Sequence, residues 1–262
     1  MFLENPGIYY EIDGNKDGTP LIFLNGIMMS TASWNELIPK FDKDLKIIRY
    51  DMRDQGKSSK LNNTYDIDIH VEDLKILLDH LQIQKVNILG VSYGSQVAQL
   101  FALKYPNRIE KMILPNSTDH VDNYLSSIGN AWKVAASLND GEKFFDISLP
   151  YIYSPKFYNE NMEWLMNRKK MFKNSLTKSW FESFTRLASS NETFNIKNKI
   201  HLIDHKILLI AGEKDIITPP ENIKDMHSKM KNSEYIELKD TGHALFFETM
   251  SEFCNLINKF MK

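Results

Sequence analysis

Short runs of aliphatic and β-branched residues alternate along this chain with longer stretches in which apolar residues recur at helical spacing. Most of the short runs are continuously apolar, which is typical of strands buried on both faces of a parallel sheet. The expected strands are residues 8–12, 21–25, 46–51, 86–91, 111–115, 206–211 and 234–238. The alternation therefore predicts an α/β fold, with a mostly parallel central sheet covered by helices on both faces.

The stretches between the expected strands have the apolar spacing of amphipathic helices. Residues 68–81 carry Val71, Leu74, Leu77 and Leu78 on one helical face. Residues 95–105, 221–230 and 251–260 show the same spacing. These helices are long enough to connect neighbouring parallel strands and to cover the sheet.

The regular alternation breaks between residues 117 and 199. This segment is much longer than a simple crossover needs, and its aromatic residues, including Trp132, Trp164 and Trp180, are spaced as in helices. We expect an α/β core formed by residues 1–116 and 200–262, with residues 117–199 inserted as a helical cap. The insertion is interpreted either as a satellite with its own small core or as a lid over an apolar pocket.

Charge and cysteine content exclude several classes of protein. The chain has 32 Lys and Arg residues against 34 Asp and Glu residues, which argues against a surface for nucleic acid or anionic membrane. Its single cysteine, Cys254, allows no internal disulfide and no zinc site built from several thiolates. No apolar run approaches the ~18 residues of a membrane span, and the chain does not start like a signal peptide. We therefore expect a cytoplasmic protein.

A G-x-S-x-G motif, Gly90 to Gly94, lies between an expected strand and an expected helix. This context is typical of a nucleophile elbow, in which the serine occupies a strained backbone conformation at a sharp turn. The residues two before and two after must be small, and Gly90 and Gly94 meet that need. Ser92 is therefore the candidate nucleophile.

A serine hydroxyl needs a base, and the base needs a carboxylate that orients it. Asp215 follows a buried strand, and His243 lies in the loop after the last expected strand. The order Ser92, Asp215, His243 is the order of the triad in α/β-hydrolases. Asp119 also follows a strand and is an alternative to Asp215 as the acid, since some family members place their acid there.

With these positions in view, nearly all of the chain resembles the α/β-hydrolase fold family with a helical cap. Residues 24–27, Leu-Asn-Gly-Ile, match the family's oxyanion loop, and residues 49–58 match its D-x-R-G-x-G-x-S turn. The resemblance implies that the backbone N–H groups of Ile27 and Tyr93 form an oxyanion hole.

Two residues depart from the family pattern. Asn25 stands where the family usually has histidine, and together with residues 31–34 it resembles the loop of the hydroxyacyl transferase that makes rhamnolipid precursors. Asp54 stands where the family prefers glycine. Because aspartate tolerates left-handed backbone better than most residues, the turn is expected to survive.

Two consecutive methionines follow the oxyanion loop. Together with Tyr93, Met28 and Met29 would form an apolar rim next to Ser92. Soft side chains such as methionine accept varied hydrocarbon shapes. Met28 and Met29 could equally be core residues. We expect Asn25, Gly26, Met28 and Met29 to contact a substrate with an apolar acyl or ring substituent.

The remaining candidates have simpler interpretations. The basic run at residues 168–173 is either a solvated helix face or, through Lys169, Lys170 and Lys173, a docking site for an acidic acyl carrier protein. His201 and His205 are four residues apart but lack a third metal ligand, so no metal site is predicted. No organic cofactor is expected.

The sequence thus predicts a serine hydrolase that acts on a small-molecule ester or thioester through an acyl-enzyme. Two alternatives remain open: an acyltransferase that passes a hydroxyacyl group from a carrier to a hydroxyl acceptor, and a non-catalytic ligand receptor on the same fold. Lyases and carbon–carbon bond hydrolases on this scaffold also keep the serine.

Overall fold

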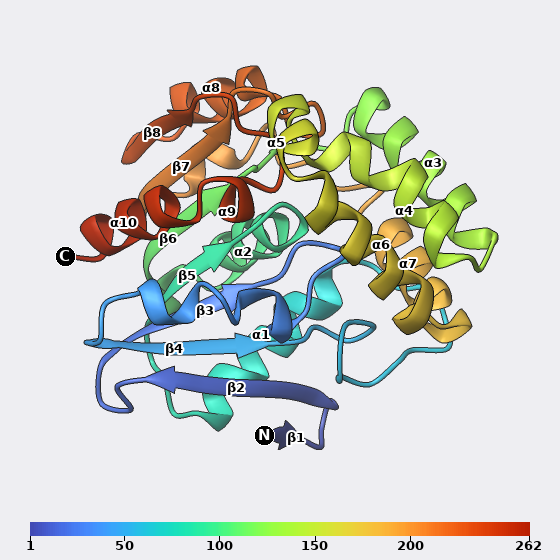
Figure 1. Ribbon diagram of the computed structural model, residues 1–262. Helices are drawn as coiled ribbons and strands as arrows, with labels where there is room; N and C mark the ends of the chain where they lie inside the picture. The colour runs from blue at the N-terminus through green and yellow to red at the C-terminus, as the bar shows by residue number, and fades with distance from the viewer.

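The computed structural model describes residues 1–262 and contains one eight-stranded sheet, in the order β1-β2-β4-β3-β5-β6-β7-β8 (Figure 1). β1 and β2 pair in antiparallel fashion, as do β2 and β4, and every other neighbouring pair is parallel. The strands are β1 Phe2–Leu3, β2 Ile8–Gly14, β3 Thr19–Leu24, β4 Leu45–Tyr50, β5 Val86–Gly90, β6 Ile109–Pro115, β7 Lys206–Gly212 and β8 Ser233–Leu238. The predicted mostly parallel sheet is confirmed.

The strand order reverses direction at the centre of the sheet. From β3 the chain moves to β4 on one side, and it then returns to β5 on the other side of β3. At such a switch point the loops after the two strands diverge and leave a crevice at the carboxyl ends. The loops that leave β3 and β5 carry Ile27 and Ser92, so the topology brings these two residues to the same crevice.

Helices cover both faces of the sheet, because alternate side chains of each buried strand point to opposite sides. On one face Ile22 and Ile88 pack in a cluster of 34 buried residues with α1 Asp68–His80, α2 Tyr93–Lys104 and α8 Pro220–Lys229. On the other face Phe23 and Leu89 pack with the short helix η1 Thr31–Trp34, with α9 Leu245–Glu248 and with α10 Met250–Met261. Cys254 is buried in this second cluster. No helix has both the length and the apolar character needed to cross a membrane.

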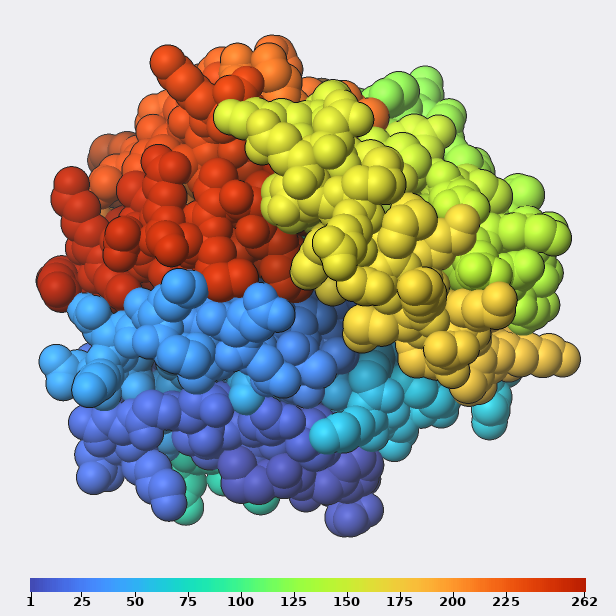
Figure 2. All heavy atoms as spheres, in the orientation of Figure 1, coloured from blue at the N-terminus to red at the C-terminus, as the bar shows by residue number.

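Five helices lie between β6 and β7, inside the predicted insertion. They are α3 Asn123–Ser137, α4 Gly141–Ile152, α5 Pro155–Glu160, α6 Met162–Ser175 and α7 Lys178–Ser190. Asp122, Asp140, Ser154 and Thr177 cap four of them by accepting hydrogen bonds from first-turn N–H groups. Figure 2 shows this segment, green to yellow, packed directly against the C-terminal segment in red.

The inserted helices have apolar contacts both with one another and with the core. Trp132 and Phe144 belong to a cluster that also contains Ile217, from the loop after β7. A second cluster joins Leu149 and Leu165 to Ala244, which directly follows His243. The insertion therefore shares its apolar contacts with the loops at the carboxyl ends of the strands.

Candidate active site

Ser92 has a strained backbone at the turn between β5 and α2. Its φ is 53° and its ψ is −115°, a region that residues with a side chain rarely occupy. The chain around it is packed too tightly for side chains: a Cβ on Gly90 would lie 2.6 Å from the carbonyl oxygen of Gly94, and one on Gly94 would lie 2.3 Å from that of Leu24. The two glycines therefore allow the turn that presents the serine.

Three side chains from separate loops form a hydrogen-bonded chain. Ser92 Oγ lies 2.9 Å from His243 Nε2, and His243 Nδ1 lies 2.7 Å from Asp215 Oδ2. Since the carboxylate can only accept, the Nδ1 of His243 carries the ring proton and Nε2 is free to accept from the serine hydroxyl. The side-chain amide of Asn116 donates to the backbone carbonyl of His243 and helps to fix its loop.

The carboxylate of Asp215 is held by its own neighbours. It is buried, and it accepts hydrogen bonds from the N–H groups of Ile217 and Thr218 at 2.8 Å and 3.1 Å and from the Thr218 hydroxyl at 2.7 Å. These donors stabilise a negative charge beside the imidazole. Asp119, the alternative acid, pairs instead with His120 Nδ1 at 2.7 Å. The structure thus brings Asp215, and not Asp119, to His243.

Two backbone donors lie next to Ser92 with no acceptor. Tyr93 is the first residue of α2, so its N–H has no partner within the helix. The N–H of Ile27, in the loop after β3, also donates to no group of the protein. Both residues line the same cavity as Ser92. Free N–H groups in this position are those that an oxyanion requires.

The structure contradicts the prediction that Asn25 contacts the substrate. Asn25 is fully buried; its amide nitrogen donates to the Tyr50 carbonyl at 2.9 Å and to Gln55 Oε1 at 3.2 Å, and its oxygen accepts from the Trp34 indole at 2.7 Å. Asn25 therefore fixes the loop from within. Its neighbour Gly26 does line a cavity.

An apolar cavity of about 110 Å³ extends from Ser92 under the inserted helices. Met28 and Met29 form part of its wall, as predicted for the rim. Its other apolar walls come from α4, α6 and α9, namely Leu149, Ile152, Phe172, Phe246 and Phe247.

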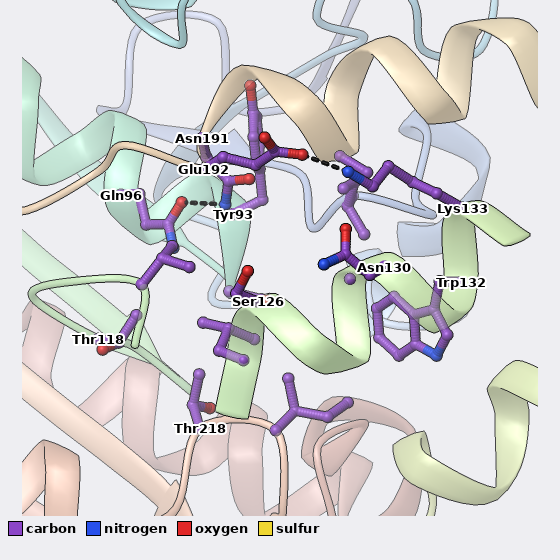
Figure 3. Close-up of a pocket in the computed structure, with 17 residues that line it drawn as sticks. Tyr93, Gln96, Thr118, Ser126, Asn130, Trp132, Lys133, Asn191, Glu192 and Thr218 are labelled. Carbon is purple, nitrogen blue, oxygen red and sulfur yellow. Dashed lines mark hydrogen bonds and ion pairs between the residues drawn. The ribbon is translucent and has the colours of Figure 1, made fainter. Parts of the chain in front are cut away.

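Ser92 also lines a second cavity of about 60 Å³, whose lining is largely apolar but includes the polar side chains of Gln96, Asn130, Lys133, Asn191 and Glu192 (Figure 3). Lys133 of α3 forms an ion pair with Glu192, and the Asn191 amide donates to Gln96 Oε1 at 2.7 Å. Trp132 and Ile27 line both cavities. The sequence alone did not indicate Gln96, Lys133, Asn191 or Glu192, because their meeting depends on how the insertion packs.

The side chain of Tyr93 does not face the apolar rim, where it was expected. Its hydroxyl is hydrogen-bonded to Ser190 Oγ at 2.7 Å, and burial raises the pKa of the phenol. His70 lies beneath it with both ring nitrogens unpartnered, and burial lowers the pKa of His70 to about 3. The hydroxyl of Tyr93 therefore connects α2 to the end of α7, and its ring contacts His70.

Asp54 keeps the turn and also connects it to the insertion. Its φ is 68°, the left-handed conformation that glycine would adopt. Its carboxylate accepts from Arg186 Nη2 at 2.6 Å and from Arg186 Nε at 3.0 Å, so the core turn is joined to α7 by a two-pronged ion pair.

The basic run does not behave as one surface. Lys169 pairs with Asp146 at 2.6 Å, Lys173 pairs with Glu142 at 3.0 Å, and Lys170 is exposed. Arg168 is partly buried and, unlike these lysines, lines the apolar cavity. His201 lies in a short 3-10 helix and His205 bonds to the Pro106 carbonyl at 2.8 Å.

Comparison with known proteins agrees with this architecture. A family model described as alpha/beta hydrolase fold matches residues 19–143 and 150–249. The crystal structure of MGS-M2, an alpha/beta hydrolase enzyme from a Medee basin deep-sea metagenome library, is 38% identical, with a TM-score of 0.94 over 97% of this chain and 94% of that one.

More distant relatives are similar over comparable lengths. The 3-oxoadipate enol-lactonase 2 of Acinetobacter baylyi is 23% identical, over 99% of this chain and 94% of its own. The 2-hydroxymuconate semialdehyde hydrolase of a Pseudomonas species is 21% identical, over 97% of this chain and 91% of its own. Since the family model covers most of its residues, this chain belongs to the alpha/beta hydrolase fold family.

Proposed function

We propose that this protein is a serine hydrolase that cleaves a carboxylic ester or thioester with an apolar acyl part. The observation that carries the proposal is the unbroken hydrogen-bonded chain from Ser92 Oγ through His243 to Asp215, at 2.9 Å and 2.7 Å. A serine paired in this way with a base and an oriented carboxylate is suited to nucleophilic attack on a carbonyl carbon.

In the proposed reaction, His243 Nε2 takes the proton of Ser92 as Oγ attacks the carbonyl carbon. The N–H groups of Ile27 and Tyr93 stabilise the resulting oxyanion. The tetrahedral species collapses, His243 gives its proton to the leaving oxygen or sulfur, and an acyl-enzyme remains. Water activated by the same histidine then releases the acid, while Asp215 stabilises the imidazolium in both steps.

The two cavities at Ser92 support separate places for the acyl part and the leaving group of the substrate. The acyl part lies in the cavity walled by Met28, Met29 and Phe172, where apolar contact stabilises it. The leaving group lies in the second cavity, where the side-chain amide of Gln96 can hydrogen-bond a hydroxyl or carbonyl. The name of the enol-lactonase relative, which denotes cleavage of an ester bond within a ring, is consistent with this reaction class.

The inserted helices act as a lid in this proposal. Trp132 of α3 and Phe172 of α6 line cavities that also contain Ser92, so these helices separate the reacting atoms from water. The ion pair of Arg186 with Asp54 and the hydrogen bond of Tyr93 with Ser190 anchor α7 to the core. Motion is therefore expected mainly in α4 to α6.

The test is hydrolysis of 4-nitrophenyl esters over a series of acyl chain lengths, together with labelling by a fluorophosphonate. Ser92→Ala should lose about a million-fold in kcat and should not be labelled, since serine loss removes the nucleophile. The control is Ser127→Ala, an exposed serine on α3 whose hydroxyl bonds only within its helix. A wild type that neither hydrolyses any ester nor becomes labelled would contradict the proposal, and acyl transfer and ligand binding would then be tested.

A further inference from the structure

Arg168 is the one side chain with a full charge in the wall of the apolar cavity. It comes from α6, and it shares this wall with Ser92 and His243. No carboxylate lies within ion-pair distance of its guanidinium, and none of its nitrogens forms a hydrogen bond within the protein. Its Nε is buried without a partner. A polar group in this state costs free energy unless something else pairs with it.

This isolation is specific to Arg168. Every other arginine of the chain has a carboxylate partner at 2.6 to 2.8 Å: Arg49 with Glu11 and Asp13, Arg53 with Asp73, Arg108 with Asp79, and Arg186 with Asp54. The lysines next to it on α6 do not compete for the position, because Lys169 and Lys173 have their own acidic partners on α4.

Two aromatic rings fix the guanidinium group. Its central carbon lies 5.1 Å from the ring centroid of Trp164, one helical turn earlier, and 5.1 Å from that of Phe247 on α9. Such contacts attract the cation to the ring faces and reduce the freedom of the side chain. Since Phe247 is four residues beyond His243, the guanidinium is held in a defined position relative to the reacting groups.

Arg168 also stands where the cavity meets solvent. An outer groove of about 420 Å³ is lined by Ser33, Arg168 and Phe247, and all three also line the apolar cavity. An anion at this boundary can keep part of its hydration while it pairs with the guanidinium. The planar fork of arginine matches a carboxylate with two parallel hydrogen bonds.

We propose that Arg168 binds a carboxylate at the far end of the substrate's acyl part, so that the preferred substrates are hemiesters of dicarboxylic acids. This rests on the proposed hydrolase function and narrows its substrate class. The apolar walls contact the methylene chain between the two ends, and Arg168 selects acyl groups that end in an anion over those that end in a methyl group.

The experiment compares kcat/KM for 4-nitrophenyl hemiesters of adipic, pimelic and suberic acids with that for neutral esters of matched chain length. Arg168→Met should lower the value for the hemiesters by about 10- to 100-fold, as expected for a lost hydrogen bond to a charged group. Neutral esters should be hydrolysed as well as before or better. Arg168→Lys, which keeps the charge without the fork, should fall between the wild type and Arg168→Met.

Lys197→Met is the matched control for net charge, because Lys197 is exposed, forms no ion pair and lines neither cavity. It should leave the ratio of hemiester to neutral ester unchanged. If Arg168→Met lowers both substrate classes equally, or leaves the ratio unchanged, then Arg168 only joins α6 to α9 and the proposal is wrong.

A binding measurement separates this proposal from the hydrolase mechanism. Adipate binding to Ser92→Ala by calorimetry should weaken about tenfold when Arg168→Met is added, a difference of about 1.4 kcal/mol. If the wild type hydrolyses no ester but this difference is found, the mechanism fails and the anion site stands. If wild type hydrolyses neutral esters while adipate binds equally with and without Arg168, the hydrolase stands and the anion site fails.

Discussion

Replacing Arg186 with methionine should destabilise the protein strongly, because Asp54 depends on this partner. The Asp54 side chain is completely buried, while the Arg186 side chain is 15% exposed. Without the guanidinium, the carboxylate keeps one protein donor, the N–H of Leu61 at 3.1 Å. Removing one partner of a buried ion pair costs about 3–5 kcal/mol, since the other charge is left uncompensated.

Glycine at position 54 should reduce that cost. Asp54→Gly removes the buried carboxylate and places glycine where φ is 68°, a conformation that costs other residues about 1–2 kcal/mol. The partly exposed Arg186 can then turn toward water. We therefore expect Asp54→Gly to be milder than Arg186→Met, and the double variant to recover most of the loss caused by Arg186→Met.

Urea denaturation of the four proteins, followed by tryptophan fluorescence, measures these free energies of unfolding. The free energy that the Asp54–Arg186 pair contributes should also depend on pH. Burial would raise the pKa of Asp54, but hydrogen bonds from Arg186 and Leu61 outweigh it and lower the pKa. The pair therefore stabilises the fold above a pH of about 4, and this contribution is lost as pH falls through the lowered pKa. A loss below 1 kcal/mol for Arg186→Met, or a double variant as unstable as the two losses added, would refute this reasoning.

Three further predictions concern the site and its support. Asp215→Asn should lower kcat for ester hydrolysis about 10⁴-fold, because it removes the acceptor that sets the tautomer of His243. Asp119→Asn should leave kcat unchanged. Equal losses of kcat in the two variants would reject Asp215 as the acid. Burial lowers the pKa of His70 from 6.5 to about 3, so between these pH values the unfolded state binds more protons than the folded state. The free energy of unfolding should therefore fall in acid, by about 2 kcal/mol at pH 5 relative to pH 7. His70→Phe should flatten this dependence in thermal melts, and an unchanged slope would count against it. Gly94→Ala should prevent normal folding, since its Cβ would lie 2.3 Å from the Leu24 carbonyl oxygen; a soluble variant with wild-type circular dichroism would show that the turn can relax.

The sequence predicted those features that depend on short segments. The expected strands match β2 to β8 to within two residues at each end, because continuous apolar runs mark strands that are buried on both faces. Ser92, Asp215 and His243 each lie at the end of such a strand or just after it. Their convergence at one edge follows from the parallel sheet alone.

Features that depend on packing between distant segments could not be predicted. Asn25 is an ordinary polar loop residue in the sequence, and only the approach of the Trp34 indole and of Gln55 removes it from the cavity. Arg168 belongs to a run of basic residues, and the register of α6 against α9 decides that it alone turns inward. The partner of Asp54 lies 132 residues away in the chain.

The two cavities that meet at Ser92 predict how the products inhibit the enzyme. In the proposed mechanism an acyl-enzyme fills the apolar cavity and leaves the second cavity, with Gln96 and Lys133 in its wall, empty. The acid product therefore competes with substrate for the free enzyme. The alcohol product can bind the acyl-enzyme, where it reverses acylation and shields the carbonyl from water. Acid and alcohol should accordingly give different inhibition patterns, competitive for the first and mixed for the second.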